Sequence, residues 1–462
     1  MAEREEEDEV VDPQQKSSYN KKQIDEILSE EGKFAYVRLC SIQLCSLYPA
    51  KHERLGDSVH YTSNFLIFQT NLVGLLLYDL EKEIEDNNDN PLNKTLLIKE
   101  LKRECGQHQK LVSIPKNLIL FALESEQYDA RHRVLIYSVA GQLGVSPDSV
   151  ADIEDEFVSH LKACKDKEKS DEGEKRKEDE SSRKFQRGVL IGLGAIGGGV
   201  LLGQRLNRRL GDIEQFEFEK LTQGDHLNVV IAVSGWLKED EGNAFKQCGF
   251  QEPWKKMILG REQYCLKWES KYITELGSAI SSFLTSTALT MTAEQVIKHT
   301  VIQGLVSAIS WPLALLQVGY IIDNPWSVCA TRSVEVGKHL AHVLMERDHG
   351  NRPVTLVGFS FGARVIFHCL KTLSSMKGNY CSEGIVQEAI MIGAPVTGDP
   401  REWQGLEKVV AGRVVNGYCK KDWLLQFVYR TASVQAKVAG LTPVLWRNRR
   451  MFNVNLSHVV SE

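Results

Sequence analysis

Apolar residues in the C-terminal half gather into four short runs that are rich in β-branched side chains and are separated by helical patterns. The runs span residues 227–233, 354–357, 389–392 and 414–419. Uninterrupted apolar runs of this length are typical of strands that are buried on both faces of a sheet. Strands that alternate with helices predict a mostly parallel sheet with right-handed crossovers and flanking helices. We therefore expect an α/β domain over residues 226–462.

In the N-terminal half, apolar residues recur at steps of three and four, as in the stretches 72–80 and 118–123. This spacing is the period of an amphipathic helix. Ser146 stands directly before Pro147, and this pair is typical of a helix start, with Ser146 as the N-cap and Pro147 in the first turn. We expect an all-α domain over residues 21–164, through which the chain could bind protein partners.

Charged segments flank the expected helical domain. Residues 1–20 carry seven acidic side chains and one arginine up to position 12, and we expect this acidic tail to be disordered. Residues 165–187 hold 17 charged side chains of both signs in a block of 23. A mixed block of this kind is typical of a solvated helix or linker, so it marks a domain boundary.

A short Gly-rich apolar segment follows, in which residues 188–203 carry no charge and include seven glycines. Gly192, Gly194 and Gly197 match a dinucleotide-binding fingerprint formally, but no βαβ pattern surrounds them. A membrane helix is a second interpretation, although 16 helical residues span about 24 Å of the roughly 30 Å hydrocarbon core. A buried or interfacial helix is the third interpretation, and the pattern favours neither of the last two.

Two further segments are apolar enough to contact a membrane. Thr300–Ile322 contains 23 residues without a charge, which is long enough to cross a bilayer, but Pro312 in its middle would kink a helix. Gly277–Ala293 is nearly as apolar and is rich in serine and threonine. Either segment could instead be a helix that covers the sheet of a soluble α/β domain.

Composition narrows the classes of function. With 42 % apolar and 25 % charged residues the chain is globular, and its net charge of −5 gives no basic field that would favour nucleic acid as a partner. The ten cysteines form no Cys-x-x-Cys pair and no metal-like cluster. The acidic N-terminus is the reverse of a secretory signal, so we expect the chain to stay on the cytosolic side.

Candidate chemistry appears where the apolar run 354–357 ends in Gly358-Phe-Ser360-Phe-Gly362 and a helical stretch, 363–373, follows at once. A strand, a tight turn and a helix in this order are the context of a nucleophile elbow, which is the turn that holds the serine of an α/β-hydrolase. The turn is so tight that the residues two before and two after the serine must be nearly free of side chain. Ser360 is therefore the candidate nucleophile, and the alternative is a Gly-rich turn with a structural serine.

The turn also suggests where negative charge would be stabilised. The Phe361 N–H begins the following helix and would be one oxyanion donor. The loop after the first predicted strand, at Gly235-Trp236, is placed to supply another.

The other members of a triad should follow later in the chain. Asp422 follows the second strand after the turn, the usual place of the acid in this fold, and we favour it over Asp399. His458 follows the acid, as the chain order requires, and is the candidate base, although it stands only four residues from the end. His368 lies two turns into the helix after Ser360, which would carry its side chain away from the serine.

These motifs together resemble the family of transmembrane and coiled-coil domain-containing protein 4. The resemblance rests on residues 354–367, 233–237, 321–326 and 393–399, which occur in the family's order along the chain, and it covers about 188–462. It implies a membrane-associated, α/β-hydrolase-like protein with few assigned functional residues and no established substrate.

The sequence departs from that family in two places. Members usually have a longer Gly/Ala-rich apolar region than residues 188–203, and they usually continue past the equivalent of Val459-Val460 into a Gly-His pair. We therefore expect this chain to be a shortened form in which the triad is incomplete and His458 is not the family's histidine.

Two functions of different classes remain at this point. The first is a serine hydrolase of the lipase or esterase kind that acts on an acyl ester or membrane lipid, with Ser360, Asp422 and His458 as triad and no metal or organic cofactor. The second is a membrane-bound scaffold or trafficking protein on an inactive hydrolase fold. The turn at Ser360 favours the first, and the position of His458 favours the second.

Overall fold

The protein forms two compact units, residues 1–190 and 191–462, and each is described by itself. The computed structural model describes residues 24, 27–48, 91–106, 108–124, 128–170, 213–237, 248–255, 260, 262–290, 325–347, 349–350, 352–376, 382–422, 425–426 and 437–458.

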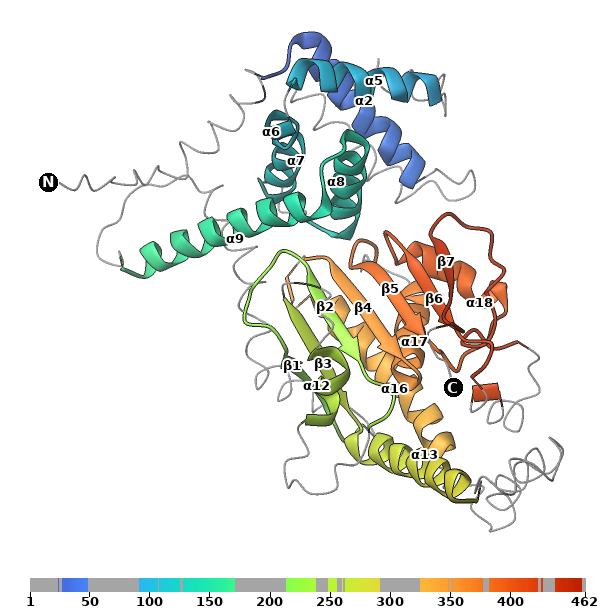
Figure 1. The fold of residues 1–462 in the computed structure, drawn as a ribbon. Coiled ribbons are helices and arrows are strands. Elements are labelled where there is room, and N and C mark those ends of the chain that lie inside the picture. Colours follow the sequence, from blue (N-terminus) through green and yellow to red (C-terminus); the bar gives the residue numbers. More distant parts are fainter. Residues whose placement is uncertain are drawn as a thin grey trace, which may run out of the picture. The chain divides into compact units, whose positions relative to one another are not determined.

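The described part of the N-terminal unit is built from helices (Figure 1). They are α2 (Glu30–Leu47), α5 (Pro91–Cys105), α6 (His108–Leu111), α7 (Ser113–Glu124), α8 (Ala130–Leu143) and α9 (Pro147–Ser170). The apolar stretch 118–123 lies in α7, where Leu118 and Ile119 are buried. Ser146 caps α9, because its Oγ accepts a hydrogen bond of 3.1 Å from the Ser149 N–H.

The C-terminal unit contains one sheet in the order β1-β3-β2-β4-β5-β6-β7. Its strands are β1 (Phe216–Lys220), β2 (Val229–Val233), β3 (Gln263–Trp268), β4 (Val354–Phe359), β5 (Val386–Ile392), β6 (Val414–Tyr418) and β7 (Met451–Asn455). β1 runs antiparallel to β3, and all other neighbours are parallel. The predicted α/β class is confirmed, and the four predicted strands are β2, β4, β5 and β6.

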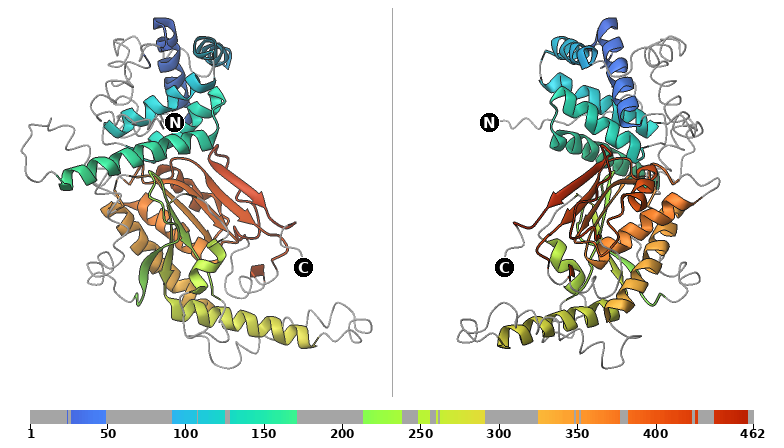
Figure 2. Two further views of the ribbon diagram at one scale, coloured as in Figure 1. Left: turned by 60° about the vertical axis from the view of Figure 1, so that its left-hand side comes forward. Right: turned by 90° about the vertical axis from the view of Figure 1, so that its right-hand side faces the viewer.

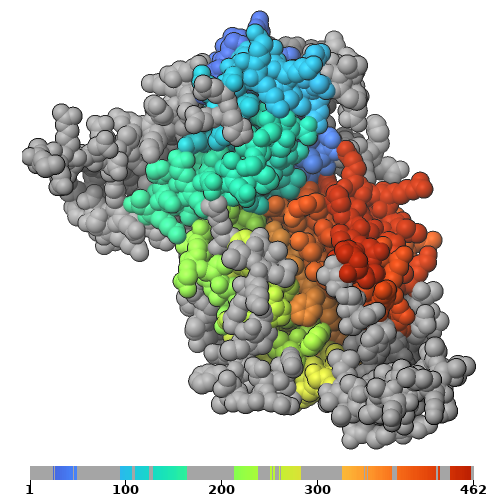
Figure 3. Space-filling model, in the orientation of Figure 1, coloured from blue at the N-terminus to red at the C-terminus, as the bar shows by residue number. Residues whose placement is uncertain are grey.

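Three strands were not predicted, and β1 lies before residue 226, so the sheet begins earlier in the chain than expected. The unpredicted strands lack the uninterrupted apolar run of a strand buried on both faces. In β7 only Met451 is buried, while Phe452 and Val454 are exposed. Residues 437–458, the last described range, form part of the surface drawn in red in Figure 3.

The helices α16 (Pro325–Glu346) and α17 (Phe361–Ser375) lie side by side and cover one face of the sheet (Figure 2). The two helices approach closely at Gly337, where an added Cβ would lie 2.6 Å from the Val365 carbonyl oxygen. The remaining helices of this unit are α12 (Cys248–Lys255), α13 (Ser270–Thr290), α18 (Pro400–Gln404) and the 3-10 turn η1 (Gly405–Lys408). β2 and β4 form the centre of the sheet, and every residue of β2 is buried.

Several predicted segments lie outside the described residues. These are the acidic tail 1–20, the linker 165–187 beyond the end of α9 at residue 170, the Gly-rich segment 188–203 and the apolar segment 300–322. The third apolar segment, 277–293, is described as far as the end of α13. None of the helices in the described ranges is both long enough and apolar enough to span a membrane.

Candidate active site

Ser360 occupies a strained turn between the central strand β4 and the helix α17. Its backbone has φ 52° and ψ −124°. A residue with a side chain rarely adopts a positive φ, because its Cβ is then crowded by the backbone. Such a conformation costs about 1–3 kcal/mol and persists only where the surroundings enforce it. Here the Ser360 N–H donates to the Ile392 carbonyl on β5 at 2.8 Å, and its carbonyl accepts from the Arg364 N–H at 3.1 Å.

The two glycines that flank Ser360 are required by close backbone contacts. A Cβ added to Gly362 would lie 2.0 Å from the Val233 carbonyl oxygen at the end of β2. One added to Gly358 would lie 2.8 Å from the Gly362 carbonyl carbon. Both distances are below any contact that a real Cβ makes, so the predicted need for small residues in the turn has a direct steric cause.

The loop after β2 packs directly against this turn. A Cβ added to Gly235 would lie 2.6 Å from both the Ser360 Cβ and the Phe361 amide nitrogen. Within the described residues, the amide groups of Gly235, Trp236 and Phe361 donate no hydrogen bond to another residue. The three amides that were predicted as oxyanion donors therefore have no partner among the described residues, and the backbones of Gly235 and Phe361 lie beside Ser360.

Ser234, the residue before this loop, is completely buried and is fixed by two tryptophans. The Trp268 Nε1–H donates to the Ser234 carbonyl oxygen at 2.9 Å, and the Trp254 Nε1–H donates to the Ser234 Oγ at 2.9 Å. The Ser234 hydroxyl in turn donates to the Phe250 carbonyl at 3.3 Å. These residues were not predicted, because they lie 16 to 34 positions from Ser234 and no local pattern connects them.

Aromatic rings surround the turn. Trp254 on α12 contacts Phe359, the residue before Ser360, with ring centroids 5.7 Å apart. Trp326 on α16 packs edge-on against Phe361, the residue after it, at 4.6 Å. The neighbourhood of Ser360 is therefore apolar on both sides, which strengthens any electrostatic interaction made there.

Each candidate acid accepts a hydrogen bond from a backbone N–H that follows it in the chain. Asp422 lies beyond the end of β6, is half-buried, and accepts a 2.9 Å hydrogen bond from the Leu425 N–H. Burial raises the pKa of the Asp422 carboxyl, and the hydrogen bond from Leu425 acts in the opposite direction. Asp399 is exposed and caps α18 by accepting from the Arg401 N–H at 3.0 Å. The choice of Asp422 over Asp399 stays a prediction.

His458 follows β7, the strand beside β6, so it lies at the same edge of the sheet as Asp422. The two loops are joined, because the Lys420 N–H donates to the Ser457 Oγ at 2.9 Å and the Leu456 N–H donates to the Tyr418 carbonyl at 2.8 Å. The His458 side chain is exposed. In the part of the chain that the structure describes, no hydrogen bond joins it to Ser360 or to Asp422.

His368, the other histidine after Ser360, is half-buried where α17 packs against α16. A Cβ added to Gly337 of α16 would lie 2.9 Å from the His368 Cβ. Burial lowers the pKa of His368 to about 3, with smaller contributions from Arg364, Lys371 and Lys338. A neutral ring packed against a neighbouring helix is suited to the core of the unit.

Acidic side chains gather at one place in the N-terminal unit. Carboxylate oxygens of Glu31, Glu100 and Glu104 lie within 4.8 Å of one another. Glu104 already accepts a 2.9 Å hydrogen bond from the Ser29 N–H, and Glu100 pairs with Arg103. The group is therefore a charged surface of α2 and α5 in which the carboxylates of Glu100 and Glu104 have protein partners.

Fold and site together define an α/β protein with a serine held in a strained strand-to-helix turn at the centre of its sheet. The chain belongs to the family described as "Protein of unknown function (DUF726)", whose model matches residues 183–462.

Relatives in this family are named as membrane proteins and, in one case, as a lipase. An uncharacterized membrane protein of Caenorhabditis elegans is 38 % identical over 393 residues, which cover 74 % of this chain and 63 % of that protein. The transmembrane and coiled-coil domain-containing protein STS1 of rice (Oryza sativa subsp. japonica) is 39 % identical over 55 % of this chain and 38 % of its own length. The probable lipase MIL1 of Saccharomyces cerevisiae is 28 % identical over 69 % of this chain and 34 % of its own length.

The chain thus spans less than two thirds of the length of each of these three relatives. The STS1 name agrees with the resemblance to transmembrane and coiled-coil domain-containing proteins. No solved structure matches the chain.

Proposed function

We propose that this protein is a membrane-associated serine hydrolase of the esterase or lipase kind, on an α/β-hydrolase-type fold. The observation that carries the proposal is the geometry at Ser360. Its positive φ is maintained by contacts with β2 and β5, and the amides of Gly235 and Phe361, which have no partner in the described ranges, lie beside it. A strained backbone of this kind persists where function needs it.

The order of the strands supports the same proposal. The serine follows β4, the candidate acid Asp422 follows β6 and the candidate base His458 follows β7. In α/β-hydrolases the triad appears along the chain in the order serine, acid, histidine. Because the carboxyl ends of parallel strands meet at one edge of a sheet, all three residues lie on the edge where such folds place their ligands.

In the proposed reaction, Ser360 Oγ bonds to the carbonyl carbon of an acyl ester while its proton passes to the imidazole of a histidine, for which His458 is the candidate in this chain. The electron pair of the carbonyl bond moves onto the oxygen, which the Gly235, Trp236 and Phe361 amides stabilise. Return of that pair expels the alcohol, which takes the proton from the imidazolium. Water then repeats the sequence on the acyl-enzyme and releases the acid. Asp422 orients the imidazole and stabilises its charge.

Membrane association is supported by the names of the C. elegans and rice relatives. The probable lipase MIL1 supports an acyl lipid as substrate class. We propose that the sheet unit works on the cytosolic side of the membrane. In fractionated cells the protein should pellet with membranes and resist carbonate extraction in part. Full recovery in the soluble fraction would contradict this part of the proposal.

Hydrolysis of short acyl esters tests the proposed chemistry. The Ser360→Ala variant should lose the activity, whereas Ser375→Ala, at the far end of the same helix, should retain it. Removal of a nucleophile leaves only the residual acceleration of the oxyanion site, roughly 10³–10⁴ over water in the best-studied triads. Equal activity of wild type and Ser360→Ala would contradict the proposal.

A non-enzymatic scaffold is the second candidate, and the exposure of His458 favours it. Without a base, Ser360 would keep an ordinary hydroxyl, and only the residual acceleration of the oxyanion site would remain. A wild-type protein that is folded and membrane-bound but inactive toward esters of every chain length would favour the scaffold.

A further inference from the structure

The amide of Gly235 belongs to the same peptide unit as the carbonyl of Ser234. The described backbone contains no cis peptide bond, and in a trans peptide the C=O and N–H groups point to opposite sides of the chain. Whatever fixes the direction of the Ser234 carbonyl therefore also fixes the direction of the Gly235 N–H. This matters because the Gly235 backbone lies against Ser360 and has no partner for its amide among the described residues.

Trp268 fixes that carbonyl. It is the last residue of β3, its side chain is fully buried, and its Nε1–H donates to the Ser234 oxygen at 2.9 Å. β3 pairs with β2 in parallel register, with Leu266 opposite Val233, so the indole lies beside the point where β2 ends. An indole nitrogen is only a donor, which means that the bond cannot reverse and the carbonyl cannot turn away without leaving the indole unsatisfied.

We propose that Trp268 is a positioning residue of the oxyanion site. Its indole N–H holds the Ser234–Gly235 peptide in the orientation that presents the Gly235 N–H beside Ser360. The inference rests on the proposed function, because it assigns Trp268 a role in the same reaction. A donor that is already oriented needs no reorganisation when the carbonyl electron pair moves onto oxygen, and this preorganisation is the source of its effect on rate.

The test replaces the indole by a ring that cannot donate. Trp268→Phe removes the N–H and keeps an aromatic ring in the site. The matched control is Trp403→Phe, because Trp403 is equally buried and its Nε1–H donates to the Thr397 carbonyl at 2.8 Å, in the loop after β5. Each variant loses one indole-to-carbonyl hydrogen bond and the same ring volume, so thermal melting should fall by a similar amount in both.

Two rates separate positioning from stability. The first is the second-order rate at which a fluorophosphonate labels Ser360, and the second is the kcat for a short acyl ester. Loss of one complete oxyanion donor costs roughly 10²–10³-fold, so a misaligned donor in Trp268→Phe should slow both rates by about 10- to 100-fold, with KM unchanged. An alkyl trifluoromethyl ketone, whose adduct carries an oxyanion, should inhibit this variant more weakly by the same factor. Trp403→Phe should keep the wild-type rates.

Should Trp268→Phe fail to fold, benzothienylalanine at position 268 provides the same test, because it has the shape of tryptophan with sulfur in place of the N–H. If the folded protein with phenylalanine or benzothienylalanine at position 268 were labelled at the wild-type rate, the role of Trp268 would be overturned and the proposed hydrolase would stand. Equal slowing of the Trp268 and Trp403 variants would assign the loss to general destabilisation and would also overturn it. A wild-type protein that is not labelled at all would overturn both the inference and the proposed function.

Discussion

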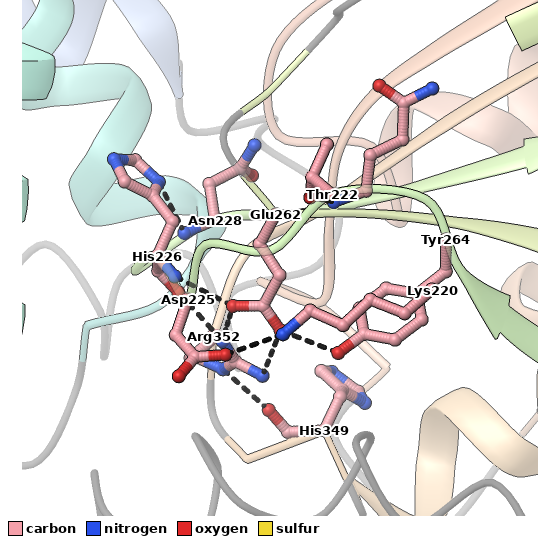
Figure 4. A network of polar contacts seen from close by, with 10 residues as sticks. Lys220, Thr222, Asp225, His226, Asn228, Glu262, Tyr264, His349 and Arg352 are labelled. Carbon is pink, nitrogen blue, oxygen red and sulfur yellow. Dashed lines mark hydrogen bonds and ion pairs between the residues drawn. The ribbon is translucent and has the colours of Figure 1, made fainter. Parts of the chain in front are cut away.

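The parallel strands begin at one edge of the sheet, the amino-terminal edge, and end at the opposite, carboxyl-terminal edge. The polar groups at these two edges are arranged in opposite ways. At the edge where β2, β3 and β4 begin, Glu262 and Arg352 form a buried ion pair, with 2.8 Å between Glu262 Oε2 and Arg352 Nη1 (Figure 4). Arg352 also donates to the carbonyls of His226 and His349 at 2.7 Å and 2.9 Å. Glu262 accepts further hydrogen bonds from the His226 N–H and the Tyr264 hydroxyl.

The opposite edge has the reverse character. There Ser360 is held in a strained turn, and the amides of Gly235 and Phe361 have no partner among the described residues. Buried charges are tolerated only where their hydrogen bonds are satisfied, so the first edge contributes rigidity. Unsatisfied donors and strain cost stability and are retained where a ligand can use them. The sheet is therefore secured by satisfied hydrogen bonds at one edge and holds a strained turn with unpartnered donors, among the described residues, at the other.

The largest expected effect comes from breaking the secured edge. Arg352→Met leaves the Glu262 carboxylate buried without its partner, and removal of one partner from a buried pair costs about 3–5 kcal/mol. Urea unfolding measures the loss. The control is Arg413→Met. The Arg413 side chain is 60 % exposed and its partner Glu388 is half-buried, so water can solvate Glu388 after the substitution and the loss should stay below about 1 kcal/mol. Equal losses in the two variants would remove the distinction between the edges.

A second prediction concerns the pH dependence of the free energy of unfolding, to which His349 at the same edge contributes. Burial lowers the pKa of His349 to about 3, with smaller contributions from Arg352 and Arg347. Its folded pKa lies below the unfolded value near 6.5, so the stability it contributes is complete above pH 6.5 and is lost as the pH falls toward 3. At pH 5 the free energy of unfolding should be lower by at most roughly 2 kcal/mol on this account of His349. His349→Gln should reduce this slope in unfolding experiments between pH 7 and 5, and an unchanged slope would contradict the assignment.

The smallest expected effect concerns the strain in the turn at Ser360. Ser360→Gly and Ser360→Ala both remove the hydroxyl, but only glycine adopts a positive φ without strain. Ser360→Gly should therefore be about 1 kcal/mol more stable than Ser360→Ala in thermal or urea unfolding. If alanine were as stable as glycine, the turn would not be strained in solution.

Much of the sheet could be predicted from the sequence, because strands buried on both faces require uninterrupted apolar runs. β2 and β4 are such strands, and their positions agree with the prediction to within two residues. β7 could not be recognised in the same way, since its exposed face leaves only Met451 buried. β1 alternates phenylalanine with glutamate and packs by one face, so its pattern is too short to separate from a loop.

The site shows the same division between local and distant information. Gly358 and Gly362 could be predicted because the tightness of a strand-to-helix turn is a local property. Trp268 could not, because its contact with Ser234 depends on the pairing of β3 with β2. The Glu262–Arg352 pair joins residues 90 positions apart, and no spacing rule connects them. The roles of Ser360, Asp422 and His458 stay predictions.

Fluorophosphonate labelling followed by peptide mapping tests most directly whether the strained turn presents Ser360 as a nucleophile. The wild-type protein, incubated with the probe, should carry one adduct, and this adduct should map to Ser360. Ser360→Ala should give no adduct while melting close to the wild type. An unlabelled wild-type protein, or an adduct that persists in Ser360→Ala, would contradict the account.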